Sequence, residues 1–259
     1  MFEARLGKTA LLKKIVEALK DILKASTLDC SDSGIQLQAM DDSHVSLVEL
    51  SLSSEGFEKY RCDRNLSLGL HLDMLAKVLK CANNDDAVTI SAQDKPDKVL
   101  FAFESQSKER TSDYELRLMN LEQEHLGIPD TSYACVVRMP AVEFARICRD
   151  LAMFSETVII ACQKDSIKFS ASGDAGTANI KLSQSVIDEE TQRVSIEVDE
   201  PVTLSFGGRY LSSFTRATPL SEQVKIGMAV NVPLLVEYAI ENFGYVRYYL
   251  APKVDEPEA

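Results

Sequence analysis

The second half of this 259-residue chain repeats the pattern of the first half. An apolar stripe with helical spacing recurs 132 residues later, in the copies Leu12, Ile15, Leu19 and Phe144, Ile147, Leu151. An alternating strand recurs at the same distance, in the copies Ile35, Leu37, Ala39 and Ile167, Phe169, Ala171. Seven later positions recur 136 residues on, and their first copies are Leu68, Leu70, Leu75, Val78, Lys80, Val88 and Ile90. The repeat predicts two similar halves, with about four extra residues in the polar stretch 184–192 of the second half.

Each half is itself predicted to contain two units of one helix followed by antiparallel strands. Apolar periodicity predicts helices at about 8–24, 72–80, 141–151 and 209–216. In the first half, alternation predicts strands near 27–31, 34–40, 45–52, 87–93, 98–104 and 111–118. Such units bury one face of each helix against a sheet. The predicted fold class is α+β, with four helix-plus-antiparallel-sheet units in two domains.

The two domains are expected to span residues 1–119 and 134–254, joined by a connector at 120–133 and followed by an acidic tail at 255–259. The connector combines glycine, proline and charges without a clean period, which predicts an extended segment on the surface. Its Leu121, Leu126 and Ile128 are too apolar for a free linker. We therefore expect a docked connector that leaves some apolar side chains near solvent.

Positive charge is concentrated on the four predicted helices. The chain has a formal net charge of −12, yet these four segments hold 11 of its 28 Lys and Arg and only 5 of its 40 Asp and Glu. The helices therefore carry a net charge of +6, and the remaining residues carry −18. An acidic protein that gathers its cations on a few helices is expected to present them to a polyanion.

The spacing of the cations places them on one face of each helix, opposite the apolar stripe. Lys13 and Lys20 are seven residues apart, as are Arg209 and Arg216, and the other pairs are three apart. An ordinary amphipathic helix would also turn lysines to water, so one such helix alone would not indicate a site. Four related helices favour a shared surface that faces a polyanion, and if that polyanion is DNA these residues can contact only its phosphates, without sequence preference. The predicted DNA-facing residues are Lys13, Lys14, Lys20, Lys77, Lys80, Arg146, Arg149, Arg209 and Arg216.

Motifs for catalysis or resident metals are missing from the sequence. There is no H-E-x-x-H zinc motif, no P-loop, no G-x-G-x-x-G fingerprint and no G-x-S-x-G nucleophile elbow. The six cysteines form no C-x-x-C pair, which predicts free thiols rather than zinc ligands or disulfides. No apolar run is long enough for a membrane span, and the first residues have no signal-peptide core. We expect a protein of the cytosol or nucleus that is not an enzyme and uses no metal or cofactor.

Several stretches, in order along the whole chain, resemble the eukaryotic sliding-clamp family, the proliferating cell nuclear antigens (PCNA). These stretches are Met1–Leu6, Ser43–Leu47, Tyr60–Asn65, Phe144–Asp150, Lys168–Gly173, Ala217–Leu220 and Tyr248–Lys253. The resemblance implies a DNA clamp fold and a ring-shaped homotrimer that encircles duplex DNA, with the four helices of each subunit lining the hole. It further implies a processivity factor for DNA replication and repair in the nucleus.

The resemblance also implies the surfaces through which the subunits join. The strand near 111–118, including Tyr114, resembles one side of the head-to-tail contact, and the strand near 176–182, including Gly176 and Ala178, resembles the other. Each strand would otherwise be an exposed sheet edge. On the sequence alone, Tyr114 could equally be an ordinary strand aromatic.

A groove for partner peptides is implied in the same way. In the family this groove receives a PIP-box motif of the type Q-x-x-[hydrophobic]-x-x-[aromatic]-[aromatic], carried by DNA polymerases delta and epsilon, flap endonuclease, DNA ligase and clients of the clamp loader. Taken singly, most of the matching residues would be read as buried core, and His44 as a turn histidine. The matching residues are Met40, His44, Val45, Leu47, Leu126, Ile128, Pro129, Val232, Pro233, Tyr249, Ala251 and Pro252.

Lys164 matches the position that the family uses as a ubiquitin and SUMO acceptor, although by itself it is one more surface lysine. The chain departs from the family at Gly127, where some relatives carry a second modifiable lysine, and at Gly207-Gly208, where bulkier residues are usual. The double glycine is expected to loosen the start of the fourth helix. The alternative to a clamp is a polyanion-binding scaffold that holds its ligand on an open surface without forming a ring.

Overall fold

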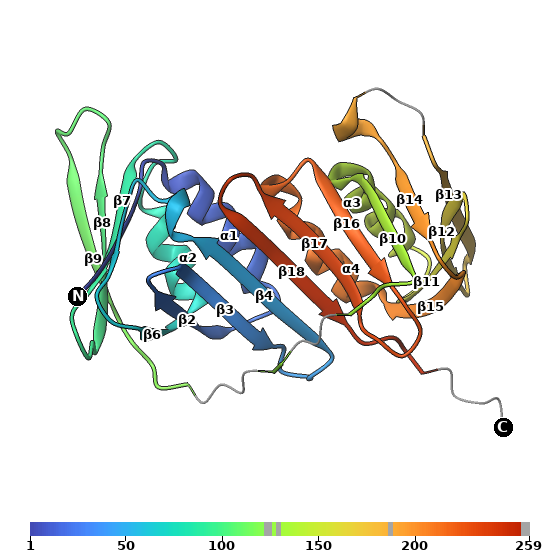
Figure 1. Ribbon diagram of the computed structural model, residues 1–259, viewed down its shortest axis with the longest axis horizontal. Helices are drawn as coiled ribbons and strands as arrows, with labels where there is room; N and C mark the ends of the chain where they lie inside the picture. The colour runs from blue at the N-terminus through green and yellow to red at the C-terminus, as the bar shows by residue number, and fades with distance from the viewer. Residues whose placement is uncertain (122–125, 128–130, 186–188, 255–259) are drawn as a thin grey trace. The chain divides into compact units, whose positions relative to one another are not determined.

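The computed structural model describes residues 1–121, 126–127, 131–185 and 189–254 (Figure 1). The chain divides into two compact units. The first unit comprises Met1–Asp42, Val48–Leu126 and Ile240–Val246. The second comprises Ser43–Leu47, Gly127–Ala239 and Arg247–Ala259. Each unit therefore includes a short segment from the other end of the chain.

The two halves of the chain have the same order of elements. Within the described residues, each half runs strand, helix, five strands, helix, three strands. The first half contains β1 Phe2–Leu6, α1 Thr9–Lys20, β2 Ala25–Ser31, β3 Gly34–Met40, β4 Ser46–Ser53, β5 Lys59–Cys62, β6 Leu66–His71, α2 Leu72–Lys80, β7 Ala87–Ala92, β8 Lys98–Glu104 and β9 Thr111–Arg117. The second half contains β10 Cys135–Pro140, α3 Ala141–Leu151, β11 Thr157–Gln163, β12 Ser166–Gly173, β13 Gly176–Ser183, β14 Ser195–Val198, β15 Val202–Gly207, α4 Gly208–Phe214, β16 Gln223–Met228, β17 Leu234–Ile240 and β18 Gly244–Leu250. The repeated order confirms the internal duplication and the α+β class.

Corresponding strands also occupy corresponding places in the sheets. The order β5-β1-β7-β8-β9 in the first half is matched by β14-β10-β16-β17-β18 in the second. The order β4-β3-β2-β6 is likewise matched by β13-β12-β11-β15. The strand pairs whose register is resolved are antiparallel, as in the hairpin of β11 and β12, where Ile160 lies opposite Phe169. Within each unit the two helices contact each other, α1 with α2 and α3 with α4 (Figure 1).

The apolar stripe of each helix forms part of the core of its unit. In α1, Leu12, Ile15 and Leu19 are buried, and in α3 the equivalent stripe is buried as well. The Phe144 ring of α3 packs on Phe169 of β12 with the ring centroids 6.2 Å apart. Burying one such side chain contributes roughly 2–3 kcal/mol. The opposite face of each helix is thereby left to carry the cations.

The structure corrects the bounds of two predicted helices. The first helix ends at Lys20 rather than at residue 24, because the N–H groups of Ile22 and Leu23 both turn back to the carbonyl of Leu19 and Leu23 becomes buried. The fourth α-helix ends at Phe214, and the chain continues as a 3₁₀ helix over Thr215–Leu220. In this region hydroxyl groups bond to main-chain carbonyls, as Thr215 does to Ser212 at 2.6 Å. Arg216 therefore lies on the 3₁₀ turn and not on the α-helix.

Strands β1, β5 and β6 were absent from the predicted set. β1 carries clear alternation, since Phe2, Ala4 and Leu6 are buried, so its signal was present at the chain start. β5 has only four residues and no buried side chain, which leaves no hydrophobic period to detect. It is held in place by its ladder with β1, where Tyr60 lies opposite Ala4.

Candidate nucleic-acid interface

The exposed faces of α1 and α2 carry lysines within the first unit. Lys14 on α1 and Lys77 and Lys80 on α2 are exposed, whereas the apolar residues next to them in each helix are buried. Because α1 and α2 contact each other, these lysines belong to one helix pair. The arrangement gives the first unit a cationic helical face opposite its core.

Two of the predicted DNA-facing lysines are tied to the protein itself. The Lys13 ammonium donates to the carbonyl oxygen of Ala82 at 2.8 Å and to Oδ1 of Asn84 at 2.9 Å, just beyond the end of α2. Lys20 lies 2.9 Å from Glu17, and its side chain is only 20% exposed. The bond to Glu17 raises the pKa of Lys20, so the ammonium stays charged. Lys13 therefore links α1 to the turn that follows α2 and contributes to the stability of the fold.

Lys13→Ala is expected to lower the free energy of unfolding by about 1 kcal/mol, because it removes a charged donor from the Ala82 carbonyl and the Asn84 amide. Urea denaturation followed by circular dichroism measures this change. Lys14→Ala is the matched control, since it removes the neighbouring exposed lysine and is expected to change stability by less than about 0.5 kcal/mol. Equal stability of the two variants would contradict the structural part assigned to Lys13.

The second unit carries arginines on the equivalent elements. Arg146 and Arg149 on α3 are exposed and both approach Asp150, at 3.7 and 3.4 Å. Exposed ion pairs of this kind are weak, so these guanidinium groups remain able to exchange Asp150 for a phosphate. Arg209 at the start of α4 lies over the Tyr210 ring at 4.8 Å, and its Nη2 donates to the Tyr210 hydroxyl at 3.1 Å. Arg216 is exposed on the 3₁₀ turn.

The chemistry of these faces suits phosphate and not base recognition. Ammonium and guanidinium groups on shallow helical faces can neutralise phosphates, but base edges require side chains placed in a groove. Such contacts release counterions, so binding is salt-dependent and independent of sequence. The same chemistry occurs in both units, which agrees with the duplicated fold.

In the first unit, the connector residue Leu126 is bonded to strand β3. Gln38 of β3 forms two hydrogen bonds with the backbone of Leu126: its Nε2 donates to the carbonyl oxygen at 2.9 Å, and its Oε1 accepts from the N–H at 2.8 Å. The Leu126 side chain remains 39% exposed. The prediction of a docked connector with an exposed apolar residue is confirmed at this position.

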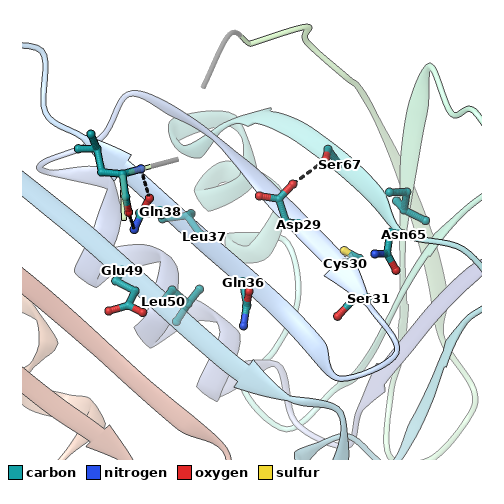
Figure 2. Close-up of a pocket in the computed structure, with 12 residues that line it drawn as sticks. Asp29, Cys30, Ser31, Gln36, Leu37, Gln38, Glu49, Leu50, Asn65 and Ser67 are labelled. Atoms are coloured by element: carbon teal, nitrogen blue, oxygen red, sulfur yellow. Dashed lines mark hydrogen bonds between the residues drawn. The ribbon is translucent and has the colours of Figure 1, made fainter. Parts of the chain in front are cut away.

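Leu126 is one of the residues that line a polar pocket of about 580 Å³, whose labelled lining residues are drawn in Figure 2. It is formed on β2, β3, β4 and β6, and its wall includes the carboxylates of Asp29 and Glu49. Asp29 accepts a hydrogen bond from Ser67 at 2.5 Å, and Glu49 accepts one from Tyr245 at 2.9 Å. The predicted groove residue Met40 lies at the end of β3 and is half-buried, but it is not part of this wall.

In the second unit, the structure brings together three of the predicted groove residues. The N–H of Ala251 donates to the carbonyl oxygen of Val45 at 3.1 Å, and Val45, Ala251 and Pro252 line one cavity. His44 beside them is exposed, with a left-handed φ of 55°. Tyr249 is 8% exposed, so it contributes mainly to the core.

For the remaining described residues of the predicted groove, the structure gives their exposure but brings none of them into the cavity lined by Val45, Ala251 and Pro252. Leu47 and Val232 are half-buried, and Pro233 is exposed. Ile128 and Pro129 lie outside the described residues, as does the tail 255–259. The groove as a whole therefore stays a prediction.

The two strands predicted to join subunits lie at sheet edges. In the described sheets, β9 pairs only with β8 and β13 pairs only with β12. Tyr114 of β9 is half-buried and packs edge-on against Phe103, with the ring centroids 5.8 Å apart. Gly176, with φ of 138°, and Ala178 lie at the beginning of β13. Long edge strands of this kind are open to pairing with another chain.

Lys164 is exposed at the turn between β11 and β12, next to Asp165. A lysine at the tip of a hairpin is accessible to a modifying enzyme, and its ammonium can be conjugated without disturbing the ladder. This placement is compatible with the predicted acceptor role.

The residues that the structure describes form no cluster of metal-ligating side chains, and their cysteines are unpaired. No group of three or more His, Cys, Asp or Glu there is arranged to hold a metal ion. All six cysteines are free, and burial raises the pKa of Cys162 to about 12, which makes its thiolate inaccessible at neutral pH. No helix among these residues is long and apolar enough to cross a membrane.

Two contributing residues, Gln38 and Lys253, were not found from the sequence. Gln38 follows the buried Leu37 on β3, so strand alternation places the two side chains on opposite faces of the sheet. No pattern in the nearby sequence predicts its bond to Leu126, which is 88 residues away. Lys253 lines the same cavity as Val45 and Pro252, and its ammonium donates to Thr157 at 2.6 Å.

Comparison with known proteins agrees with these observations. Residues 1–125 match the family model "Proliferating cell nuclear antigen, N-terminal domain", and residues 127–253 match the corresponding C-terminal domain model. The chain is 60% identical over 258 residues to "Proliferating cell nuclear antigen 2" of Drosophila melanogaster, with 100% of both chains covered. The duplicated α+β fold, the cationic helix pairs and these matches together show that the chain belongs to the proliferating cell nuclear antigen family, the family of DNA sliding clamps.

Proposed function

We propose that three copies of this chain close into a ring around duplex DNA and slide along it, holding replication and repair enzymes on the template. The observation that carries the proposal is the pair of helices in each unit, which buries its apolar stripe and exposes lysines or arginines. The rest of the chain carries a net charge of −18, which repels DNA elsewhere. The proposal assigns no catalysis and no cofactor to the chain itself.

Ring closure is proposed to pair β9 of one copy with β13 of the next. Both strands are sheet edges, and their pairing would satisfy main-chain groups that otherwise face water. The contact joins two different surfaces, so it generates a closed ring only if the rotation between copies closes. Tyr114 on β9, with Gly176 and Ala178 on β13, would lie in this contact.

Partner enzymes are proposed to dock through PIP-box peptides on the groove that the family resemblance implies. An apolar groove receives one turn of helical anchors from such a peptide. The expected partners are DNA polymerases delta and epsilon, flap endonuclease, DNA ligase and the clamp loader, and the expected compartment is the nucleus. Lys164 is proposed as the acceptor for ubiquitin or SUMO.

Retention on DNA circles tests the ring. The protein is loaded by a clamp loader onto nicked circular DNA, and the complex is separated from free protein by gel filtration before and after linearisation. We expect retention on the circle and rapid loss from the linear form, because a ring leaves only over an end. Native mass spectrometry is expected to give three times the 28.7 kDa of one chain. Equal retention on both DNA forms, with a monomeric mass, would instead favour an open polyanion-binding scaffold.

A further inference from the structure

The sheet β13-β12-β11-β15 of the second unit carries lysines and no carboxylate. Its four strands contain Lys168 on β12 and Lys181 on β13, and none of their residues is Asp or Glu. The corresponding strands β4, β3, β2 and β6 of the first half contain Asp29 and Glu49 and no Lys or Arg. The two corresponding sets of strands therefore carry formal charges of +2 and −2, in a chain whose net charge is −12.

This reversal of charge falls on equivalent positions of the internal repeat. The matched pairs, each 132 residues apart, are Asp29 and Ala161, Gln36 and Lys168, and Glu49 and Lys181. The strand register agrees with this match, because Asp29 lies opposite Gln36 and Ala161 lies opposite Lys168. The lysines of the second half are thus side-chain differences on one shared backbone plan, and they convert an acidic face into a basic one.

Lys168 and Lys181 lie directly opposite each other on adjacent antiparallel strands. The Cβ atoms of such a pair are roughly 5 Å apart, so the two like charges repel each other. Both side chains are exposed, and among the residues that the structure describes no carboxylate forms an ion pair with either ammonium. A negative group bound between them would replace the repulsion with two charge-assisted hydrogen bonds.

The next row of side chains on the same outward face adds a hydrogen-bond donor and an apolar contact. Residues two apart in a strand share a face and lie roughly 6.7 Å apart, so Ser170 belongs to the row beside Lys168. The Ser170 hydroxyl donates to Oδ1 of Asn179 at 3.0 Å, which leaves the Asn179 amide nitrogen as a donor for a ligand. Ile159 lies opposite Ser170 on the other side and is 38% exposed. A ligand on this face therefore meets two cations, an amide and an aliphatic side chain.

The lysine face lies on the opposite side of the sheet from α3. Phe169 follows Lys168 in β12 and packs on Phe144 of α3, so strand alternation turns Lys168 away from that helix. Duplex DNA on the exposed arginines of α3 would be separated from Lys168 by both the helix and the sheet. The lysine face is therefore suited to a ligand other than that duplex.

We propose that the outward face of β11, β12 and β13 is a docking site for an acidic segment of a partner protein. An Asp or Glu side chain of the segment bridges Lys168 and Lys181, and an apolar side chain near it packs on Ile159. Charge complementarity selects the segment, because the rest of this acidic chain repels it. The site requires neither the peptide groove nor the helical DNA surface. It also leaves the edge of β13 open to another copy, since strand pairing uses main-chain groups at the edge and the segment contacts side chains on the face.

Two labelled peptides test the assignment on the full chain by fluorescence anisotropy at low salt. One peptide has two glutamates on each side of a leucine, and the other has Gln in place of every Glu. The Glu peptide is expected to bind about five- to tenfold more tightly than the Gln peptide. The double variant Lys168→Gln, Lys181→Gln is expected to reduce this ratio to about one. The matched control is Lys77→Gln, Lys80→Gln, which removes the same charge from the exposed face of α2 and is expected to keep the ratio.

A charge swap provides the complementary result. The double variant Lys168→Glu, Lys181→Glu is expected to lose the preference for the Glu peptide and to bind a peptide with Lys in place of Glu more tightly than the Gln peptide. A ratio near one for the unchanged chain, or a preference that survives Lys168→Gln, Lys181→Gln, would overturn the proposal. Loss of the preference in the Lys77→Gln, Lys80→Gln control would also overturn it, because the acidic peptide would then bind the helical surface.

Two other occupants of the face are distinguished by the same variants. A lower native mass of Lys168→Gln, Lys181→Gln with an unchanged peptide ratio would assign the lysines to a contact between copies and overturn the proposal. Binding of the Glu peptide only after removal of residues 255–259 would overturn it in favour of that acidic segment of the same chain. The peptides lack the motif expected in the groove, so their failure to bind leaves the proposed clamp function intact.

Discussion

The quadruple variant Lys77→Glu, Lys80→Glu, Arg149→Glu and Arg216→Glu is expected to bind duplex DNA at least about a hundredfold more weakly than the unchanged chain. All four side chains are exposed, and they come from α2, α3 and the 3₁₀ turn after α4. Each loses a phosphate contact and adds a repulsive charge. The slope of log K against log salt is expected to fall by roughly one for each contact removed. Anisotropy titrations of a labelled duplex at several salt concentrations measure both quantities.

The choice of these four residues follows from the structure. Lys20 is left out because it is only 20% exposed and paired with Glu17, and Lys13 because it is bonded to Ala82 and Asn84. The matched control reverses four exposed cations outside the helices, namely Arg64, Lys95, Lys108 and Lys168. It changes the net charge equally, so it corrects for the overall field of the protein. Equal weakening in both quadruple variants would refute a localised DNA surface.

Tyr114→Ala is expected to convert the proposed trimer into monomers at micromolar concentration and to abolish retention on circular DNA. Tyr114 lies on the edge strand β9 and is only half-buried within its own unit. Part of its aromatic side chain is therefore exposed and can contact a neighbouring copy. Removing an aromatic side chain at the centre of an interface costs about 2–4 kcal/mol at each contact. A ring contains the contact three times, so the loss accumulates. Native mass spectrometry and sedimentation velocity measure the change in mass.

Two controls distinguish assembly from folding. The Tyr114→Phe variant keeps the aromatic ring of residue 114 and its packing on Phe103. This variant is expected to remain a trimer. Thermal unfolding of Tyr114→Ala establishes that the monomer is folded, since the Phe103 contact is lost as well. A folded Tyr114→Ala protein with the mass of a trimer would show that β9 is not the contact strand.

The sequence predicted the features that depend on local periodicity. The helices Leu72–Lys80 and Ala141–Leu151 have the predicted bounds, because apolar residues at spacings of three and four mark a buried stripe. The positions of Lys77, Lys80, Arg146 and Arg149 opposite that stripe follow from the same spacing. The 3₁₀ continuation after Phe214 could not be predicted in this way, because it depends on hydroxyl bonds and on Pro219.

The partner surface was accessible from the sequence only through its family resemblance. Taken singly, Val45, Ala251 and Pro252 have no local pattern that separates a groove from a core. The structure joins Val45 to Ala251 by a backbone hydrogen bond across more than 200 residues. Contacts of such separation follow from how strands pair, and no period in the chain encodes them.

By itself, the sequence determined the duplication, the α+β class and the gathering of positive charge on helices, since all three are read from spacing along the chain. Only the tertiary structure decided which of these cations are available to bind a phosphate and which are bonded within the protein. It bonds Lys13 to a carbonyl 69 residues away, and it places Lys253 beside Arg209 in one cavity. It also anchors the start of α4, because the N–H of Gly208 donates to the carbonyl oxygen of Glu156. These outcomes depend on hydrogen bonds and packing between distant segments, which form only when the chain has folded.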